Sequence, residues 1–289
     1  MTERSISICG FPESGKTTYL AAVWHLITTG ADPTALRFDS LRNGDASHLN
    51  VIATRWRKGL KQIRTETPSN KLVSMNLKNA AGDVIRLTLP DLSGESYRDM
   101  FELRECDPLV AEFLEVSAGM LLLIHADKIK APLMVTTVAA QAHALGSTLP
   151  PDQEVRWEPR IAPTQIQLVE FLQLLRQPPL SVGFKRIAVV LSAWDKVEDE
   201  GRSPELFLEE RLPLLKQYLE SNADGWDWQV YGVSAQGGDY EKEDEPFTGR
   251  KLEKLNELKA LDEPSMRIKV ISKTSSSSDL TEPISWLMN

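Results

Sequence analysis

The stretch GFPESGKTT, residues 10–18, decides the fold that this sequence predicts. It has the spacing G-x-x-x-x-G-K-[ST], whose defining positions are Gly10, Gly15, Lys16 and Thr17. The run RSISIC before it is rich in β-branched residues and ends at a glycine, which predicts a short buried strand. Between residues 17 and 28 apolar side chains recur at helical spacing, which predicts a helix. The stretch therefore joins a strand to a helix.

A loop in this position is suited to binding phosphate, because its backbone N–H groups and the start of the helix converge on the anion. Gly10 and Gly15 permit the tight backbone that such a loop requires. The Lys16 ammonium can reach the terminal phosphates of a nucleotide, and the Thr17 hydroxyl can bind Mg²⁺. We predict that the loop binds a nucleotide through Gly10, Glu13, Ser14, Gly15, Lys16, Thr17 and Thr18.

A second element follows a predicted β-hairpin. Residues 71–90 contain two alternating runs on either side of NAAGD, which has the composition of a turn. The second run leads into Asp91-Leu-Ser-Gly94, a D-x-x-G sequence. An aspartate at the end of an interior strand can hold the Mg²⁺ shell while the Gly94 N–H contacts the terminal phosphate. Alone, D-x-x-G usually marks a turn, but downstream of a phosphate loop it indicates a metal and phosphate site.

Two further apolar strands end in polar residues and bear on the base. Residues 187–191 precede SAWD, which ends at Asp195, and the run WQVYGV precedes Ser234 and Ala235. Open α/β sheets bind ligands at the carboxyl ends of their strands. The Asp195 carboxylate can accept hydrogen bonds from guanine N1–H and the 2-amino group together, a donor pair that adenine lacks. We therefore predict guanine as the base, bound by Asp195, Lys196, Ser234 and Ala235.

These elements, in this order, resemble those of a Ras-like P-loop GTPase of the translation-factor-related class. More narrowly, ICGFPESGKTTYLAAVWHL, DLSGE and DLTEPISWLM resemble the double-GTPase proteins of bacterial conflict systems. The resemblance implies a regulatory switch that binds GTP and GDP with Mg²⁺ and acts on a second GTPase, an adaptor or an effector. It also implies a threonine that senses Mg²⁺ and the γ-phosphate. Thr65 and Thr67 are the candidates, with an ordinary loop threonine as the alternative.

Three positions depart from the GTPase pattern. Ser192 stands where Asn or Thr is usual, and Ala193 where a lysine normally packs over the base, so Trp194 or Lys196 would have to compensate. Glu95 follows Gly94, where many small GTPases have the glutamine that orients the attacking water. A carboxylate there also brings negative charge near the γ-phosphate, so we expect slow hydrolysis. The catalytic residues that the resemblance implies are Lys16, Glu95 and Thr67, and the metal ligands are Thr17, Asp91 and Thr67.

Composition limits the class of protein. The 289 residues are 42% hydrophobic and 26% charged, which is typical of a soluble globular protein. A net charge of −8 argues against a general nucleic-acid binder, and the stretch RWRKGLKQIR is interpreted as the solvated face of a helix. Arg64, which ends that stretch, is likewise interpreted as solvated rather than as a catalytic arginine. No apolar run is long enough for a membrane span, and no signal segment is evident, so we expect a cytoplasmic protein.

We expect a three-layer α/β P-loop domain, with a mostly parallel central sheet and helices on both faces. One domain is expected over residues 1–289, with insertions at about 30–70 and 127–163, and the run SKTSSSSD is expected to be a flexible connector. Two other functions stay open. Ala193 and Glu95 favour a nucleotide-binding scaffold that does not hydrolyse. The phosphate loop alone would also fit an ATP-dependent phosphotransferase or ATPase.

Overall fold

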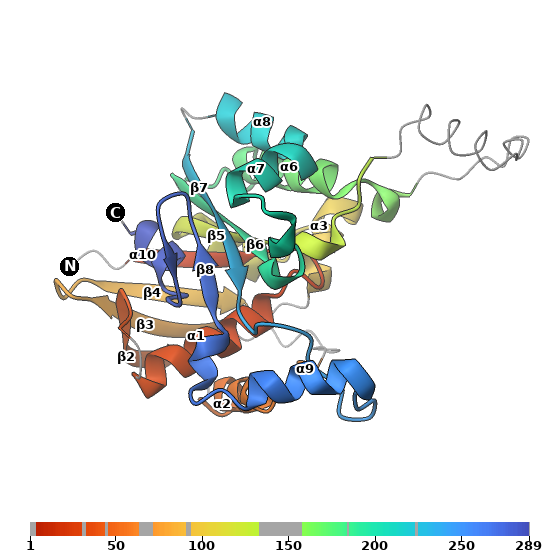
Figure 1. Cartoon of the computed structure of the whole chain (residues 1–289). Coiled ribbons are helices and arrows are strands. Elements are labelled where there is room, and N and C mark those ends of the chain that lie inside the picture. Colours follow the sequence, from red (N-terminus) through yellow and green to blue (C-terminus); the bar gives the residue numbers. More distant parts are fainter. Residues whose placement is uncertain are drawn as a thin grey trace, which may run out of the picture.

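The computed structural model describes residues 4–30, 33–43, 46–63, 72–90, 94–132, 158–183, 185–222 and 225–288. In this part of the chain one sheet runs through the molecule (Figure 1). Its strands are β1 (Arg4–Cys9), β2 (Leu36–Asn43), β3 (Leu72–Asn79), β4 (Val84–Pro90), β5 (Ser117–His125), β6 (Arg186–Ser192), β7 (Asp227–Ser234), β8 (Lys269–Ile271) and β9 (Ser276–Ser277). Their order in the nine-stranded sheet is β2-β3-β4-β1-β5-β6-β7-β8-β9.

The centre of the sheet is parallel and its two ends are antiparallel. Strands β4, β1, β5, β6 and β7 pair in parallel. The short turn between β3 and β4 reverses the chain, so these strands pair antiparallel, as the hairpin prediction required. Strands β2, β8 and β9 also pair antiparallel with their neighbours. The predicted parallel centre is therefore present within a mixed sheet.

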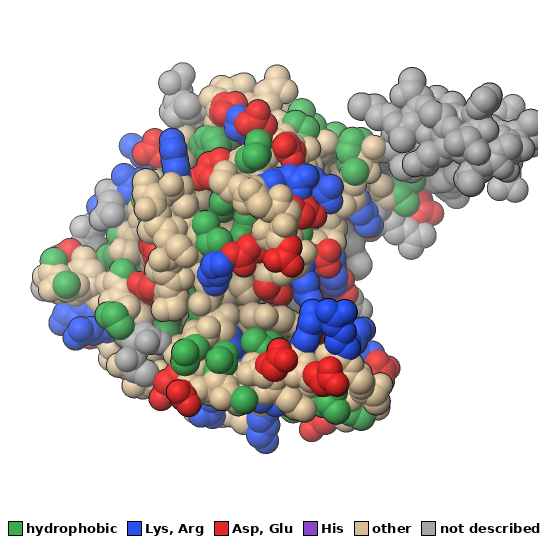
Figure 2. Space-filling model, viewed as in Figure 1, with side chains coloured by type: hydrophobic (Ala, Val, Ile, Leu, Met, Phe, Trp, Pro, Cys, Tyr) green, Lys and Arg blue, Asp and Glu red, His purple; other side chains and the backbone are tan. Residues whose placement is uncertain are grey.

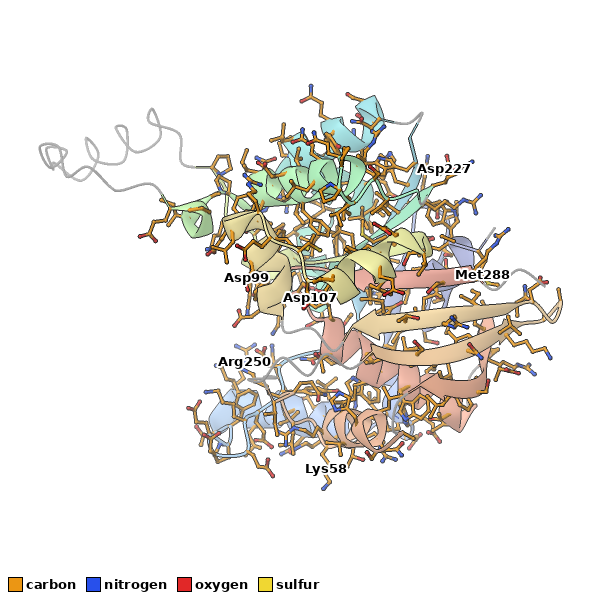
Figure 3. The ribbon with its side chains drawn as sticks, turned by 180° about the vertical axis from the view of Figure 1, so that it is seen from behind. Lys58, Asp99, Asp107, Asp227, Arg250 and Met288 are labelled. Carbon is orange, nitrogen blue, oxygen red and sulfur yellow. The ribbon has the colours of Figure 1, made fainter. Side chains whose placement is uncertain are left out.

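Helices cover both faces of the sheet. One face carries α1 (Lys16–Thr29), α2 (Ala46–Arg57), α9 (Gly249–Lys259) and α10 (Glu282–Trp286). The other carries α3 (Gly94–Leu103), α4 (Pro108–Glu115), α6 (Thr164–Arg176), α7 (Pro204–Arg211) and α8 (Pro213–Ser221). In Figure 3, Asp99 and Asp107 lie with α3 and α4, whereas Lys58 and Arg250 lie with α2 and α9 on the opposite side. The predicted three-layer α/β architecture is confirmed.

Alternation along the central strands produces two cores. In β5, Leu121 and Leu123 face the core under α1 and α2, whereas Met120, Leu122 and Ile124 face the core under α6 and α8. All five side chains are buried. Because both faces are covered, the central strands contain almost continuous apolar runs, and polar side chains of the sheet can meet solvent only at its edges.

Short 3-10 helices lie in the segments that connect the longer elements. They are η1 (Ala126–Lys128), η2 (Pro159–Ile161), η3 (Trp194–Lys196), η4 (Glu198–Glu200) and η5 (Pro264–Arg267). On the face drawn in Figure 2, Lys and Arg side chains lie interspersed with Asp and Glu side chains. None of the helices in the described ranges has the length and apolar character that a bilayer span would need.

The structure corrects one expectation about an irregular segment. The segment at about residues 30–70, expected to be an insertion, contains β2 and α2. The expected flexible connector SKTSSSSD contains β9 instead. The hydroxyl oxygens of Ser275 and Ser277 donate to the two carboxylate oxygens of Glu282 at 2.7 and 2.8 Å. These hydrogen bonds hold the serine-rich hairpin against the start of α10.

The segment before α10 is bonded to the helix that follows the phosphate loop. The Tyr19 hydroxyl donates to the Leu280 carbonyl oxygen at 2.6 Å, and both residues are buried. Nearby, the Leu36 N–H donates to the Thr281 hydroxyl at 3.0 Å. The segment just before α10 therefore holds α1 and the start of β2 together.

Tyr19→Phe should lower the free energy of unfolding by about 1–3 kcal/mol, because it leaves the buried Leu280 carbonyl without its donor. Urea denaturation measures this change. Tyr231→Phe is the matched control, because its hydroxyl bonds the exposed Gln229 side chain, which water can replace. Equal losses from the two variants would contradict this account of Tyr19.

Candidate functional site

The loop between β1 and α1 has the tight backbone that its sequence predicts. Gly15 precedes α1 with φ +87°, in the left-handed region that favours glycine. A Cβ on Gly10 would lie 2.5 Å from Ser14 Oγ and 2.6 Å from the Leu123 carbonyl oxygen. At either position, a residue with a side chain would force the neighbouring atoms to move. The loop is thus shaped closely around its own backbone, which leaves main-chain N–H groups at the start of α1 to meet a ligand.

Lys16 is held inside this loop by oxygen acceptors. Its Nζ donates to the Gly10 carbonyl at 2.5 Å, to the Phe11 carbonyl at 3.0 Å and to Ser14 Oγ at 3.3 Å. Burial lowers the pKa of the Lys16 ammonium to about 8, and the Cys9 thiol beneath the loop opposes part of that shift. A buried ammonium with its pKa near neutrality gains from any anion that approaches it.

The guanine element is tied to the phosphate loop. Ser192, the last residue of β6, donates from Oγ to the Ser14 carbonyl oxygen at 2.8 Å. The same Oγ lies 3.4 Å from the Ile124 carbonyl oxygen of β5. Ser192, at a position where Asn or Thr is usual, therefore joins the two halves of the site.

Asp195 is oriented by the end of the next strand. Its Oδ1 accepts from Ser234 Oγ at 2.7 Å, and Ser234 Oγ accepts from the Gly237 N–H at 3.1 Å. Lys196, the next residue, forms an ion pair with Asp239 at 2.8 Å, and this hydrogen bond lowers the pKa of the Asp239 carboxyl. The predicted residues Asp195, Lys196, Ser234 and Ala235 thus lie together at the carboxyl ends of β6 and β7.

Of the two residues expected to compensate for Ala193, Trp194 is excluded. Its side chain is 1% exposed and packs edge to face on Phe207, with ring centroids 5.4 Å apart. A Cβ on Gly232 would lie 2.5 Å from the indole, so the ring occupies the core against β7. Ala193 itself has φ +53°, and this left-handed turn directs the chain into η3. The prediction that Trp194 could cover the base is wrong, because the hydrophobic core holds its ring.

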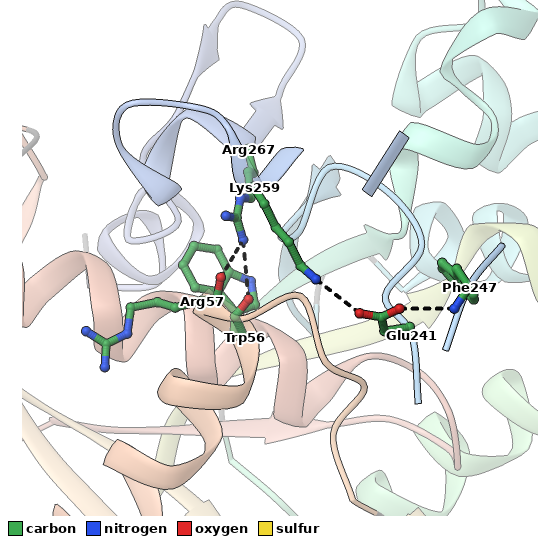
Figure 4. A network of polar contacts seen from close by, with 6 residues as sticks. All are labelled: Trp56, Arg57, Glu241, Phe247, Lys259 and Arg267. Carbon is green, nitrogen blue, oxygen red and sulfur yellow. Dashed lines mark hydrogen bonds and ion pairs between the residues drawn. The ribbon is translucent and has the colours of Figure 1, made fainter. Parts of the chain in front are cut away.

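Helix α2 supports the second half of the site. Trp56 donates from its indole nitrogen to the Ala235 carbonyl oxygen at 2.8 Å. The Arg267 guanidinium lies over the Trp56 ring at 5.6 Å and donates to the Trp56 and Arg57 carbonyls (Figure 4). The segment that follows Ala235 is therefore fixed to α2 by a buried aromatic side chain. No local sequence pattern predicts this contact.

Glu241, in the acidic run of residues 239–246, contacts α9 and the chain that follows α2. Its carboxylate accepts from Lys259 Nζ and from the Phe247 N–H, each at 3.0 Å (Figure 4). Its backbone N–H donates to the Gly59 carbonyl, and its carbonyl accepts from the Lys61 N–H at 2.8 Å. The chain beyond the guanine element thus pairs with the chain that leaves α2.

The γ-phosphate side is described only in part. Residues that lie outside the described ranges are Arg64, Thr65, Thr67 and Asp91. Gly94 and Glu95 are the first two residues of α3, which packs against α6 and η2. Thr17 and Thr18 lie in the first turn of α1, beside Lys16. The predicted metal set is therefore represented by Thr17 alone in the described part of the chain.

Two residues near the end of β5, His125 and Lys128, were not predicted from the sequence to lie at the site. His125 pairs in register with Ser192, and burial, followed by Lys128, lowers its imidazole pKa. Its Nδ1 is buried and has no hydrogen-bond partner among the residues that the structure describes. Lys128 forms an ion pair with Glu13 of the phosphate loop at 2.6 Å. Their position at a strand's carboxyl end was the available signal.

The loop that contains Lys16 and the Asp195 carboxylate thus follow strands whose carboxyl ends lie at the same edge of the sheet. A family model described as Double-GTPase 1 matches residues 7–287. The chain belongs to the Double-GTPase 1 family. The resemblance seen in the sequence is thereby confirmed, and membership of the Double-GTPase 1 family supports GTP binding and GTP hydrolysis by this chain. A comparison with curated proteins found no match.

Solved GTPase structures show similarity to this Double-GTPase 1 protein at low identity. The bacterial selenocysteine-specific elongation factor EF-Sec is 16% identical with a TM-score of 0.36, over 82% of this chain and 27% of that one. The putative nucleolar GTP-binding protein 1 of Plasmodium falciparum is 10% identical with a TM-score of 0.37, over 88% and 82%. The Ski7 GTPase-like domain of S. cerevisiae, bound to GDP and inorganic phosphate, is 14% identical with a TM-score of 0.39, over 91% and 51%.

The lowered pKa of Lys16 has a consequence for stability. Because the folded-state pKa of about 8 lies below the ordinary value of 10.5, the unfolded chain binds more protons between these values. The folded state should therefore gain stability relative to the unfolded state as pH rises from about 8 to 10, by up to about 1.4 kcal/mol per pH unit. Urea denaturation without nucleotide, compared with Lys16→Met to remove other alkaline effects, measures the gain. A difference between the two proteins that does not change with pH would contradict it.

Proposed function

We propose that this chain is a GTP-binding regulatory switch that hydrolyses GTP slowly with Mg²⁺. The observation that supports the proposal is the hydrogen bond from Ser192 Oγ to the Ser14 carbonyl oxygen, which ties the end of β6, three residues before Asp195, to the phosphate loop. One end of the site is suited to phosphates, through Lys16 and the backbone of Gly10–Thr18. The other end offers a carboxylate that suits guanine.

The residues present fit a nucleotide and its metal. The backbone at Gly10 and Gly15 is too tight for larger residues, as expected of a loop whose main-chain N–H groups bind phosphate. Thr17 hydroxyl oxygen, together with Asp91 and Thr67, would hold Mg²⁺, which prefers oxygen ligands. When bound, Mg²⁺ neutralises charge that develops on the phosphate oxygens.

The biological setting follows from the family resemblance. We assign the chain to a bacterial conflict or defence system in the cytoplasm, where it would control a second GTPase, an adaptor or an effector. We treat residues 1–289 as one domain, since the nine strands form one continuous sheet. The difference between GTP-bound and GDP-bound forms would arise near α3, which begins at Gly94 next to the γ-phosphate position.

Asp195→Asn should weaken the binding of GTP and favour the binding of xanthosine triphosphate, because the amide can donate to the 2-oxygen of xanthine. Competition among GTP, xanthosine triphosphate and ATP for wild type and variant measures the change. Ser234→Ala is the matched control: it removes the hydroxyl that orients Asp195 and should weaken GTP without favouring xanthosine triphosphate. Retained GTP preference in Asp195→Asn would exclude Asp195 as the base reader, and wild-type preference for ATP would favour the phosphotransferase or ATPase alternative.

Glu95→Gln should raise the single-turnover rate of GTP hydrolysis with little change in GTP affinity. A neutral amide can donate to the transferring phosphoryl group, whereas an ionised carboxylate can only accept and opposes its negative charge. Glu95→Ala, which lacks the amide, should not raise the rate. A fall in rate with both substitutions would make Glu95 catalytic through its carboxylate, and no measurable hydrolysis in any of the three proteins would favour the scaffold alternative.

A further inference from the structure

Glu13 places a negative charge inside the loop that is proposed to bind a polyanion. It stands three residues before Lys16 and has φ +63°, a conformation that residues with side chains seldom adopt. Its side chain is 49% exposed, and negative charge at this position opposes the approach of phosphate oxygens at short range. A phosphate loop with this residue needs a compensating cation.

Lys128 supplies a cation at this position. It ends η1, which directly follows β5, and its Nζ lies 2.6 Å from the Glu13 carboxylate. Both side chains are about half exposed, at 50% and 49%, and an ion pair so exposed adds little to folding stability. The pair therefore affects the net charge of the phosphate loop more than the stability of the fold.

The pair lies between the two halves of the site. Helix η1 packs against η3, the turn that carries Asp195. His125, just before η1, is influenced by the charges of Lys128, Asp195 and Glu13, which places these groups around the end of β5.

The other nearby lysines are engaged elsewhere. Lys16 donates to carbonyl oxygens of the loop, and Lys196 pairs with Asp239. At position 193, where the GTPase pattern has a lysine, this chain has alanine. Lys128, by contrast, contacts the Glu13 carboxylate directly.

We propose that Lys128 sets the nucleotide affinity of this protein by neutralising Glu13, so that the phosphate loop attracts a polyphosphate. This assignment rests on the proposed function and adds a residue that acts on the ligand through Glu13. Lys128 is thus a positioning and charge-balancing residue, distinct from Lys16, which is proposed to contact the phosphates directly.

The test is a charge-removing double-mutant cycle, with Lys128→Met, Glu13→Gln and the double variant. Affinities for GTP, GDP and guanosine are measured with Mg²⁺ at fixed ionic strength, by calorimetry or by competition with fluorescent GDP. Lys128→Met should lower GTP affinity about tenfold, lower GDP affinity less, and leave guanosine affinity unchanged, because repulsion by Glu13 grows with ligand charge. The double variant should return to within about twofold of wild type, since its loop has no uncompensated carboxylate.

Two controls separate charge from structure. Lys128→Arg keeps the ion pair and should bind GTP like wild type. Lys216→Met, which removes an ion-paired lysine from α8, should do the same. An equal loss for GTP and guanosine in Lys128→Met, or a double variant as weak as Lys128→Met, would overturn the assignment. A wild-type chain that binds none of the three ligands would overturn the proposed function, and the assignment with it.

Discussion

The hydrogen bond from Ser192 Oγ to the Ser14 carbonyl oxygen connects the two halves of the candidate site, and the rest of the arrangement depends on it. It joins the end of β6 to the loop between β1 and α1, across the intervening strand β5. Because Ser192 and Ser14 are both buried, water cannot easily replace this contact. The distance between the phosphate loop and Asp195 is thereby fixed by the sheet.

The position of the site follows from how the sheet is covered. Helices bury both faces, so the described polar residues of the site gather where strands end and turns begin. Parallel pairing of β1, β5, β6 and β7 brings those ends to one edge. Gly10, His125, Ser192 and Ser234 therefore meet there although they are far apart in the sequence. Asp227, the first residue of β7, lies at the opposite edge of the sheet. Figure 3 labels it together with Met288, which lies on the same side of the molecule.

Features set by local sequence were predictable, and features set by tertiary contacts were not. The phosphate loop, the β3–β4 hairpin and strands β5 to β7 have strong apolar patterns and clear turn residues, and the structure contains them. Strand β2, with the sequence LRFDSLRN, was missed because charged residues and two register shifts hide its alternation. The burial of Trp194 and the Glu13–Lys128 ion pair depend on which strands become neighbours, and the pattern around each residue does not specify that.

In the described part of the site, hydrogen bonds hold the residues around Asp195 in place. Around the phosphate loop, positive and negative side chains lie close together. Asp195 is held by Ser234, and the Ala235 carbonyl is held by Trp56 of α2, so little ordering should be required when a base binds. On the phosphate side, Lys16 has a pKa lowered by burial, and Glu13 is matched by Lys128. Where the scaffold is already formed, differences in nucleotide affinity arise mainly from charge, because Coulomb energies change more with each added phosphate than packing does.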